Sequence, residues 1–507
     1  MSNKYFITTP IYYVNDIPHI GHAYTSIAAD FISRYKQMIG IDTMFLTGTD
    51  EHGQKIQKAA DDNSISPIEL CDKNSEKFRE LTKTLNLSNN DFIRTTEKRH
   101  IEGAKSLWNM LIENDDIYLD NYEGWYSVSD ETFYNEKDLT KQSDGSFKTI
   151  TGGPVDWIEE ESYFFRLSKY SNQLLKLYDE NPNFILPKSR RNEVISFVKS
   201  GLKDLSVSRN TFNWGIKVPN NDKHVMYVWL DALSSYPNSL GYISDAKSKL
   251  SSYWSNAVHI IGKDILRHHA IYWPAFLMSA NLELPKRIFA HGWWTNEGNK
   301  ISKSLGNTID PVQIINQFGL DQIRYYLLRE ITFGSDGDFS ISSLKSRINS
   351  DLSNDLGNLC QRSLTMIVKH CNSVVPSGSN IENSDKVFLS KIRNQLDELS
   401  LLVDNQEINA YIIKIWMVIA DANKYFNDNK PWELKDNDVN KFKNVLFVTA
   451  DIIKQIAVMI NPIMPETSRN ILNFFLINID YISLDSLDIN IGNNKVCNIK
   501  PLFPKVE

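Results

Sequence analysis

The chain has 507 residues, enough for about three domains of ordinary size. Its composition, 42% hydrophobic and 23% charged, is that of a globular protein and excludes wholesale disorder. Lys and Arg number 55 and Asp and Glu number 62, so the net charge is −7. A polybasic coat for nucleic acid is therefore excluded, and any nucleic acid must bind a local basic face.

The cysteines and the hydropathy exclude several further classes. No C-x-x-C pair is present among Cys71, Cys360, Cys371 and Cys497, so the spacing offers neither a zinc knuckle nor a dense disulfide framework. Mean hydropathy is −0.35, and no apolar run approaches the roughly 18 residues that a membrane span needs. The N-terminus lacks the apolar stretch of a signal peptide. We expect reduced thiols in a soluble, cytoplasmic protein.

The first fifty residues predict a parallel strand–helix–strand unit. Residues 5–9 favour a short buried strand that ends at Pro10. A helix follows, because apolar side chains recur at helical spacing from Tyr24 to Met38 before Gly40. Residues 43–47 predict the second strand. Such a unit has a right-handed crossover and is typical of a doubly wound sheet.

The same pattern returns later in the chain. Residues 258–261 predict a strand, 264–278 a helix and 287–291 another strand. The region between the two halves, from about residue 116 to 222, has its own turn signals and strand-like aromatic stretches such as 163–165. We therefore predict an α/β fold in which one doubly wound parallel sheet is interrupted by an inserted domain.

From about Ser343 onward the pattern becomes helical. Long apolar segments with a 3.6-residue period and few strand signals cover residues 352–370, 387–402, 411–427 and 441–460. The C-terminal part is therefore predicted to be an all-α bundle.

Two motifs suit phosphate chemistry. His19, Gly21 and His22 follow the first strand, where a helix N-terminus beyond a parallel strand binds phosphates, and both imidazoles face one side of the first turn. Gly21 lets a flat base approach the backbone. Alternatives are two surface histidines, or a zinc site, which prefers i,i+4 spacing and lacks a visible third ligand.

The second motif is Asn299-Lys300-Ile301-Ser302-Lys303-Ser304, just after the last strand of the second half. Two lysines and two serines near glycines suit a mobile clamp on polyphosphate, although a solvated charge run has the same composition.

Together, these motifs resemble those of class I aminoacyl-tRNA synthetases. The family's His-Ile-Gly-His and Lys-Met-Ser-Lys-Ser match residues 19–22 and 300–304, with Ile301 in place of Met. Further segments are similar to methionyl-tRNA synthetases in particular, and the resemblance covers nearly the whole chain: residues 8–13, 48–53, 160–165, 227–232, 261–264 and 289–293.

The resemblance implies that ATP, accompanied by Mg²⁺, activates L-methionine, which is then transferred to the 3′ end of initiator and elongator tRNA(Met). It implies catalytic roles for His19, His22, Lys300 and Lys303, and ATP binding by His19, Gly21, His22, Gly262, Asp264 and Lys303. The implied methionine site consists of Ile11, Tyr13, Asp50, Trp229, Ala232, Leu233, Tyr236 and His291, although any single aromatic residue among them could equally be ordinary core.

The resemblance also divides the chain into domains. It implies a Rossmann catalytic domain in two halves, an inserted connective domain on the acceptor side, a linking segment with the lysine motif, and a helical anticodon-binding domain. Their ranges are 1–116 and 223–295 for the two halves, 117–222 for the insertion, 296–342 for the linking segment and 343–507 for the helical domain.

In the helical domain Asn358, Arg362 and Trp432 are the implied readers of the anticodon. The alternatives are a surface polar pair and a packing tryptophan. Residues 188–209 hold six basic and two acidic side chains, a candidate strip toward the acceptor stem.

Two departures from relatives matter. Many members hold zinc in cysteine knuckles of the insertion, but this insertion has no cysteine, and residues 124–133 carry serine and aspartate instead. We expect no structural zinc and no metal ligands. The insertion is also too short for a separate editing domain. The sequence ends soon after the bundle, without the domain through which some relatives dimerise, so we expect a monomer.

Two rival functions remain. A sibling enzyme could adenylate a small acid without charging tRNA, but the anticodon-type helical domain argues against it. A catalytically inactive RNA-binding paralogue should have lost motif residues such as His19, Lys303 or Asp50, and all are present.

Overall fold

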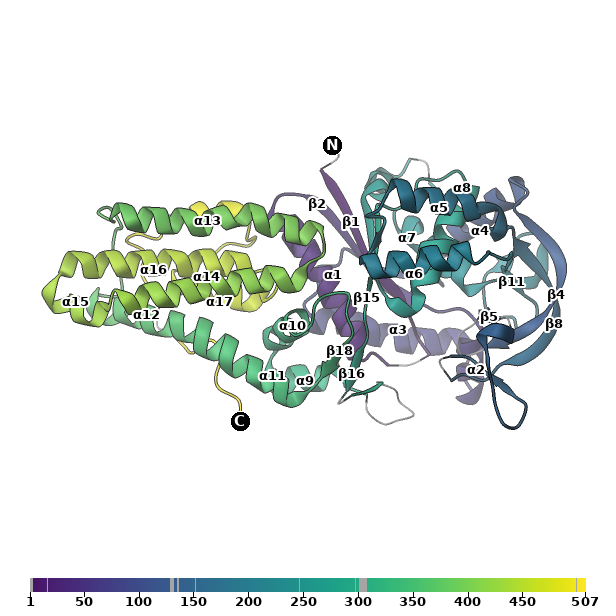
Figure 1. Ribbon diagram of the computed structural model, residues 1–507, viewed down its shortest axis with the longest axis horizontal. Coiled ribbons are helices and arrows are strands. Elements are labelled where there is room, and N and C mark those ends of the chain that lie inside the picture. Colours follow the sequence, from purple (N-terminus) through teal and green to yellow (C-terminus); the bar gives the residue numbers. More distant parts are fainter. Residues whose placement is uncertain are drawn as a thin grey trace. The chain divides into compact units, whose positions relative to one another are not determined.

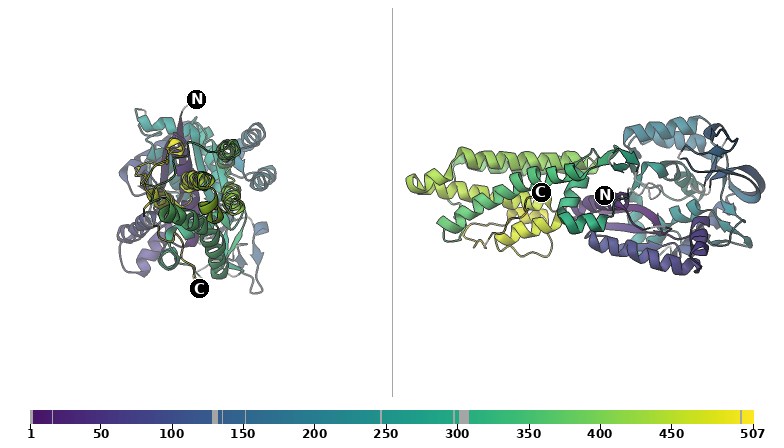
Figure 2. Two further views of the ribbon diagram at one scale, coloured as in Figure 1. Left: turned by 90° about the vertical axis from the view of Figure 1, so that its left-hand side faces the viewer. Right: turned by 90° about the horizontal axis from the view of Figure 1, so that it is seen from below.

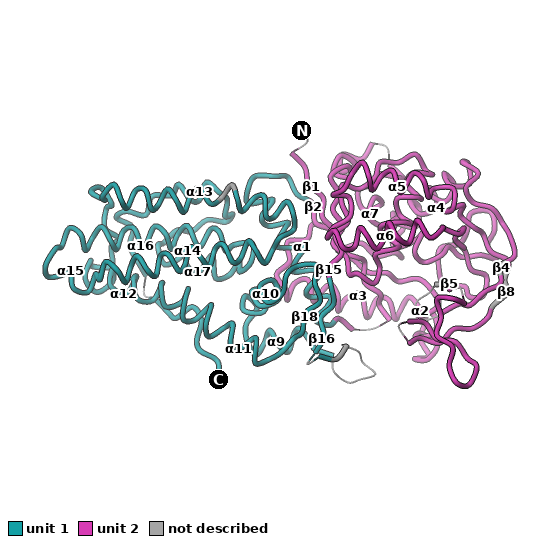
Figure 3. The backbone as a smooth tube through the Cα atoms, viewed as in Figure 1, with its two compact units in different colours: residues 1, 19–43, 292–507 teal, residues 2–18, 44–291 magenta. Residues whose placement is uncertain are grey.

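The computed structural model describes residues 3–15, 17–127, 132–134, 136–150, 152–245, 247–296, 298–300, 308–497 and 499–507. The chain forms two compact units, coloured separately in Figure 3. The first unit comprises His19–Thr43 and Gly292–Glu507, and the second comprises Ser2–Pro18 and Met44–His291. The polypeptide therefore passes from one unit to the other three times.

The second unit is built on a six-stranded sheet in the order β3-β2-β1-β14-β15-β9, of which β1, β2 and β15 are labelled in Figure 1. Its strands are β1 (Lys4–Tyr13), β2 (Asp42–Asp50), β3 (Asp91–Arg94), β9 (Ile185–Leu186), β14 (Ala257–Gly262) and β15 (Arg287–His291). The pairs β2–β3, β1–β14, β14–β15 and β15–β9 are parallel. Because β1 pairs with β14, the two halves predicted from sequence join in one sheet, and the predicted fold class is confirmed.

Parallel strands bring their carboxyl ends to one edge of the sheet. Gly262 at the end of β14 lies opposite His291 at the end of β15, and Phe289 lies opposite Leu186 at the end of β9. This edge is where ligands bind in open α/β sheets.

Helices of the second unit surround a large hydrophobic core. They are α2 (Gln54–Asp62), α3 (Pro67–Thr84), α4 (Lys98–Glu113), α5 (Ser171–Glu180), α6 (Lys188–Lys199), α7 (Val228–Ser239) and α8 (Trp273–Ser279). Every residue of α7 is buried. Gly103 of α4 allows α7 to approach closely, because a Cβ there would lie 2.0 Å from the Asn238 Oδ1.

The insertion is built from antiparallel strands. One sheet has the order β10-β8-β4-β5, with long strands β4 (Ile117–Ser127) and β8 (Asp156–Phe165) beside short β5 (Thr132–Tyr134) and β10 (Leu205–Ser206). A second sheet has the order β11-β13-β12, with β11 (Ser208–Arg209), β12 (Lys217–Val218) and β13 (Asn221–Met226). A separate hairpin pairs β6 (Thr140–Lys141) with β7 (Phe147–Lys148).

The first unit combines α1 (Ile20–Met38), a small sheet β17-β16-β18 and the C-terminal helices, several of which run alongside one another in the right-hand view of Figure 2. The strands are β16 (Trp294–Asn296), β17 (Asn299–Lys300) and β18 (Gly337–Phe339). The helices are α9 (Pro311–Phe318), α10 (Leu320–Arg329), α11 (Ile341–Arg347), α12 (Asn358–His370), α13 (Asn383–Asp404), α14 (Ile408–Asp428), α15 (Pro431–Asn437), α16 (Val439–Ile460) and α17 (Pro465–Phe474). For residues from about 343 onward, which follow the small sheet, the all-α prediction is confirmed.

Two local predictions were wrong. The first strand does not end at Pro10, because β1 pairs with β14 at Phe6–Thr8 and the missing N–H of proline lies beyond that stretch. The helix predicted for 264–278 is interrupted by a π-helical turn at His268–Tyr272 before α8. Pro274 cannot donate to the Ala270 carbonyl, which instead accepts from the Tyr178 hydroxyl at 2.6 Å.

In the part of the chain that the structure describes, no helix is both long enough and apolar enough to cross a membrane.

A buried ion pair joins α1 to the C-terminal helices. The Arg324 Nη2 on α10 donates to the Asp30 Oδ2 on α1 at 2.6 Å, and both side chains are fully buried. The Arg324 Nε and Nη2 also donate to the carbonyls of Ile463 and Pro462 at 2.8 and 3.1 Å. Burial lowers the pKa of Arg324, so its charge depends on the Asp30 carboxylate.

Replacing Arg324 by Leu should destabilise the first unit by about 3–5 kcal/mol, because it removes a buried charged partner from the fully buried Asp30 carboxylate. Urea unfolding measures the loss. The control is Arg393→Leu, which breaks an exposed pair with Asp488 and should cost less than about 1 kcal/mol. Equal losses in the two variants would contradict the role of the buried pair.

Candidate active site

The first histidine motif begins α1. His19 is the N-cap residue in an extended conformation, and its Nδ1 accepts from the Gly21 N–H at 3.1 Å. The His22 Nδ1 accepts from the His19 N–H at 3.0 Å, and the two rings lie 3.9 Å apart. A Cβ on Gly21 would lie 2.9 Å from the His19 ring, so glycine is needed for this arrangement. The two histidines therefore cap the helix.

These hydrogen bonds fix the tautomers. A ring nitrogen that accepts a hydrogen bond carries no proton, so a neutral His19 or His22 is protonated on Nε2. Burial, with a smaller contribution from the charge of His19, holds the pKa of His22 well below its usual value. At neutral pH His22 is an uncharged Nε2–H donor.

The lysine motif belongs to the same stretch of the chain as the first unit. Lys300 ends β17, but its side chain and residues Ile301, Ser302, Lys303 and Ser304 lie outside the described residues. The chain is described again from residue 308, and the Ile309 carbonyl accepts from the N–H of Ile20, in the first turn of α1, at 3.1 Å. The segment that follows the lysine motif is thus bonded directly to the histidine motif.

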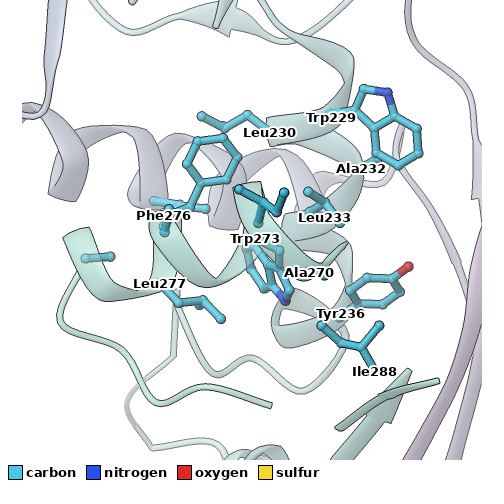
Figure 4. Packing of buried hydrophobic residues seen from close by; sticks show 14 of the residues in the cluster. Trp229, Leu230, Ala232, Leu233, Tyr236, Ala270, Trp273, Phe276, Leu277 and Ile288 are labelled. Atoms are coloured by element: carbon cyan, nitrogen blue, oxygen red, sulfur yellow. The ribbon is translucent and has the colours of Figure 1, made fainter. Parts of the chain in front are cut away.

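Four predicted methionine-site residues lie on α7, all buried. Trp229, Ala232 and Tyr236 are three and four positions apart and share one face of the helix. Figure 4 shows the Trp229 and Tyr236 rings on the same side, whereas Leu230 points toward Phe276 of α8. Leu233 packs within the same core cluster.

Two histidines that the sequence did not reveal support these rings. The Trp229 indole stacks on His268, with centroids 3.8 Å apart. The Tyr236 hydroxyl and the His269 Nε2 are 2.7 Å apart, and the His269 Nδ1 lies 3.0 Å from the Ile265 carbonyl. Because a carbonyl only accepts, His269 donates from Nδ1 and accepts the Tyr236 proton at Nε2. No sequence spacing signals this arrangement.

The ends of β1 and β2 bring further predicted residues to the same unit. Ile11 and Asp50 are buried and Tyr13 is half-buried, and the Val14 N–H donates to the Asp50 carbonyl at 3.3 Å. Burial raises the pKa of Tyr236, and the charges of Tyr12 and Asp50 raise it further. The Asp50 carboxylate therefore acts electrostatically on Tyr236 of α7.

A buried network holds α7 in place. The Asp231 Oδ2 accepts from the His52 Nδ1 at 2.7 Å, and the Asp231 Oδ1 accepts from the His100 Nε2 at 2.5 Å. Burial alone would raise the pKa of Asp231, but the charges and hydrogen bonds of the two histidines lower it to about 2. In the sequence Asp231 lies between Trp229 and Ala232, two predicted methionine-site residues. The sequence therefore indicated this segment, but it did not indicate the network of Asp231 with the two histidines.

The ends of β14 and β15 carry the remaining predicted ligands. His291 is buried and Asp264 is exposed. A Cβ on Gly262 would lie 2.4 Å from the Asp264 Oδ1 and 3.9 Å from the His291 Cε1, so the three residues form one cluster. Gly262 must lack a side chain because the Asp264 carboxylate occupies that space.

Two of the three predicted anticodon residues lie together in the first unit. The Arg362 guanidinium on α12 lies 5.7 Å from the Trp432 ring centre and 5.3 Å from that of Phe426. Its Nη2 donates to the Asn427 Oδ1 at 3.0 Å. Trp432 is 40% exposed. Asn358, one helical turn before Arg362, is also exposed. Asn358 and Trp432 are therefore exposed to solvent, and Arg362 is half-buried.

Among the described residues, no group of three or more His, Cys, Asp and Glu side chains is arranged to hold a metal ion.

The fold and the paired motifs are those of a class I aminoacyl-tRNA synthetase. The family model described as "tRNA synthetases class I (M)" matches residues 5–145 and 144–364, and "Anticodon binding domain of methionyl tRNA ligase" matches 375–483. Methionine–tRNA ligases of Rickettsia felis and Rickettsia bellii are 54% identical over 476 residues and 50% identical over 514. The alignment with the Rickettsia felis enzyme covers 93% of this chain and 92% of that enzyme. The alignment with the Rickettsia bellii enzyme covers 100% of each chain.

A solved structure agrees over the full length. Methionyl-tRNA synthetase of Mycobacterium tuberculosis, in complex with methionyl-adenylate, superimposes with a TM-score of 0.96 at 45% identity, covering 99% of each chain. The chain belongs to the methionyl-tRNA synthetase family.

His269 should make stability depend on pH. Burial lowers its pKa from 6.5 to about 4. Between these values the unfolded chain binds a proton that the folded chain does not, so stability falls by about 3 kcal/mol as the pH drops from 6.5 to 4. His269→Gln, which keeps an acceptor for Tyr236, should remove this part of the dependence. Urea unfolding at several pH values tests it; identical pH profiles would refute the assignment.

Purified protein should contain no stoichiometric zinc, because the insertion has no cysteine to supply thiolate ligands. Elemental analysis measures the metal content, and thermal unfolding with and without a zinc chelator measures its contribution to stability. Stoichiometric zinc, or a lowered melting temperature with chelator, would show that other residues hold a structural metal.

Proposed function

We propose that this protein activates L-methionine with ATP, forming methionyl-adenylate and pyrophosphate, and then transfers methionine to the 3′ end of initiator and elongator tRNA(Met). The supporting observation is the full-length similarity to an enzyme solved with methionyl-adenylate. In the first step a methionine carboxylate oxygen forms a bond to the α-phosphorus of ATP, and the bond to pyrophosphate breaks. ATP enters as its magnesium complex.

We assign the phosphate contacts to the two motifs. Charge builds on phosphate oxygens in the transition state, so positioned donors and cations lower the barrier. The Nε2 protons of His19 and His22 supply the donors, and that of His22 is uncharged at neutral pH. Lys300 and Lys303 supply cations. Gly21 and Gly262 allow close approach of the nucleotide, and the Asp264 carboxylate accepts hydrogen bonds from the ribose hydroxyls.

We assign methionine recognition to the second unit. The Asp50 carboxylate pairs with the substrate ammonium group, since a buried cation requires an anionic partner. The aromatic rings of Trp229 and Tyr236 contact the thioether, which gains roughly 0.3–1.5 kcal/mol from each sulfur–aromatic contact. Side chains that complete the apolar pocket are Ile11, Tyr13, Ala232, Leu233 and His291.

We assign anticodon recognition to Asn358, Arg362 and Trp432. Proteins read unstacked RNA loop bases by stacking on aromatic rings or guanidinium planes and by hydrogen bonds to base edges. An exposed Trp432 beside the Arg362 guanidinium offers both surfaces, and the Asn358 amide offers a donor and an acceptor.

We also propose that the protein acts as a monomer in the cytoplasm. Every residue assigned above belongs to one chain, so the chemistry needs no second copy. Sedimentation of purified protein and fractionation of cells test these two statements.

Methionine-dependent exchange between ATP and pyrophosphate, followed by charging of total tRNA, tests the whole proposal. Exchange with charging of tRNA(Met) alone is expected. Exchange without charging would favour a sibling enzyme that adenylates a small acid, and absence of both reactions would favour an inactive paralogue.

Lys303→Ala should slow pyrophosphate exchange about a hundredfold, or by roughly 3 kcal/mol, with little change in the KM for methionine. The expected reason is that Lys303 stabilises charge that develops mainly in the transition state. Steady-state exchange kinetics measure both parameters. An exchange rate within a few-fold of wild type would contradict this role.

Trp432→Ala should separate the two half-reactions. Loss of one stacking ring costs roughly 1–3 kcal/mol in RNA binding, so kcat/KM for charging should fall at least about tenfold while exchange without tRNA stays near wild type. The matched control is Tyr481→Ala, which truncates another exposed ring of the first unit.

If Trp432 serves only packing, its truncation will lower the melting temperature, exchange and charging together. Unchanged charging, or equal loss in both reactions, would therefore overturn the anticodon assignment.

A further inference from the structure

Glu51 is a buried carboxylate that the chemistry assigned above does not use. It directly follows Asp50, the last residue of β2, and its side chain is fully buried. A buried carboxylate is costly unless charged partners and hydrogen bonds satisfy both of its oxygens. Its position next to a proposed substrate ligand therefore calls for a role.

Four hydrogen bonds hold the Glu51 carboxylate. The Arg94 guanidinium makes two of them, because Nε donates to Oε1 at 2.7 Å and Nη2 donates to Oε2 at 2.9 Å. The Thr49 hydroxyl donates to Oε1 at 2.7 Å, and the Thr96 hydroxyl donates to Oε2 at 2.5 Å. A forked pair of this kind fixes the orientation of the carboxylate as well as its position.

The backbone of Glu51 is fixed too. Its N–H donates to the Thr95 hydroxyl at 2.9 Å. Its carbonyl accepts from the Trp214 indole N–H at 2.5 Å and from the Cys71 thiol, with the sulfur at 3.4 Å. Segments that follow β3, lie within α3 and follow β11 therefore all bind this one residue.

The residues on either side of Glu51 act on α7. The His52 Nδ1 donates to the Asp231 Oδ2 at 2.7 Å, and the Asp50 carboxylate acts electrostatically on Tyr236. Glu51 is instead bound by β3 and the residues after it. Because a planar peptide unit joins Glu51 to each neighbour, holding Glu51 also holds the direction in which the Asp50 side chain leaves the backbone.

The charges of this cluster lie near one another. Burial raises the pKa of the Cys71 thiol, and the charges of Glu51 and Asp50 raise it further, whereas the charge of Arg94 lowers it. Both carboxylates and the guanidinium are therefore near one buried thiol. Because Glu51 neutralises the Arg94 guanidinium, that cation competes less with a substrate ammonium group for the Asp50 carboxylate.

We propose that Glu51, held by Arg94, is a positioning residue for methionine: it fixes the Asp50 carboxylate where the substrate ammonium group binds. This inference rests on the proposed function, which assigns that group to Asp50. The ammonium group is not altered when the carboxylate reacts with ATP, so its contact is equally strong before and during the reaction. The effect of Glu51 therefore belongs in the KM for methionine and not in kcat.

The variant Glu51→Gln keeps the shape of the side chain and removes its charge. In pyrophosphate exchange the KM for methionine should rise about tenfold, since a 1 Å shift of a binding group costs about a hundredfold and a smaller shift costs less. The KM for ATP and kcat should stay within about twofold of wild type. An unchanged KM for methionine, or equal rises for both substrates, would overturn the inference.

Methioninol identifies the part of the substrate that is affected, because it keeps the ammonium group and lacks the carboxylate. Calorimetry should show that Glu51→Gln raises the Kd of methioninol by the same factor as the KM for methionine. A wild-type Kd would place the effect at the substrate carboxylate and would contradict the role of Glu51.

Two matched controls separate positioning from stability. Asp72→Asn removes the exposed second partner of Arg94, whose Nη2 donates to the Asp72 Oδ1 at 2.5 Å, and should leave the kinetics unchanged. Glu330→Gln removes a carboxylate that pairs with Arg347 at 2.8 Å in the first unit. It should lower the melting temperature without raising the KM for methionine. A rise in either control as large as that in Glu51→Gln would show that the pair is merely structural.

Thr96→Val provides a second test, which applies even if Glu51→Gln does not fold. It removes one of the four hydrogen bonds from a half-buried position, and the KM for methionine should rise about two- to threefold. No rise would overturn the inference. Failure of the proposed function is distinguishable, because wild-type protein would then lack methionine-dependent exchange, or Asp50→Asn would keep the wild-type KM for methionine.

Discussion

One buried carboxylate, Asp231, sets the geometry of the second unit's site. Its two oxygens accept from His52, which follows β2, and from His100 on α4. Asp231 lies on α7 beside Trp229 and Ala232, so the same helix that offers the pocket face is tied on its other side to the strand that ends in Asp50. A buried charge requires these partners, and its position is therefore tightly determined. The face of α7 that carries Trp229 and Tyr236 is therefore held in place as well.

Burial also decides the chemistry of the histidines. The Trp229 ring stacks on His268, and the Tyr236 hydroxyl bonds to His269. Burial lowers the pKa of both histidines, so at neutral pH both are uncharged and add no cation beside these rings. At the start of α1 backbone N–H groups occupy Nδ1 of both His19 and His22. In a neutral His19 or His22 the proton then lies on Nε2.

Sequence periodicity and spacing predicted the sheet halves, the helical region and the motif positions, because these depend on short-range patterns. For the interruption at His268–Tyr272 the sequence offered one signal, Pro274, but the Tyr178 hydroxyl of α5 that bonds the open Ala270 carbonyl comes from a distant segment. The His52–Asp231–His100 network likewise joins three distant segments, and no single segment carries a signal for it. Arg362 and Trp432 come together because α12 and α15 both pack against α16, so no spacing in the sequence signals their contact.

The threefold passage of the chain between the units has a consequence for biosynthesis. Asp30 on α1 is separated from its buried partner Arg324 by 294 residues. At 5–20 residues per second the ribosome needs about 15–60 s to make that stretch. During this time the Asp30 carboxylate on α1 lacks Arg324, the buried partner that it has in the folded protein. The first unit therefore cannot complete its core as the nascent chain emerges, because α1 must wait until α10 has been synthesised.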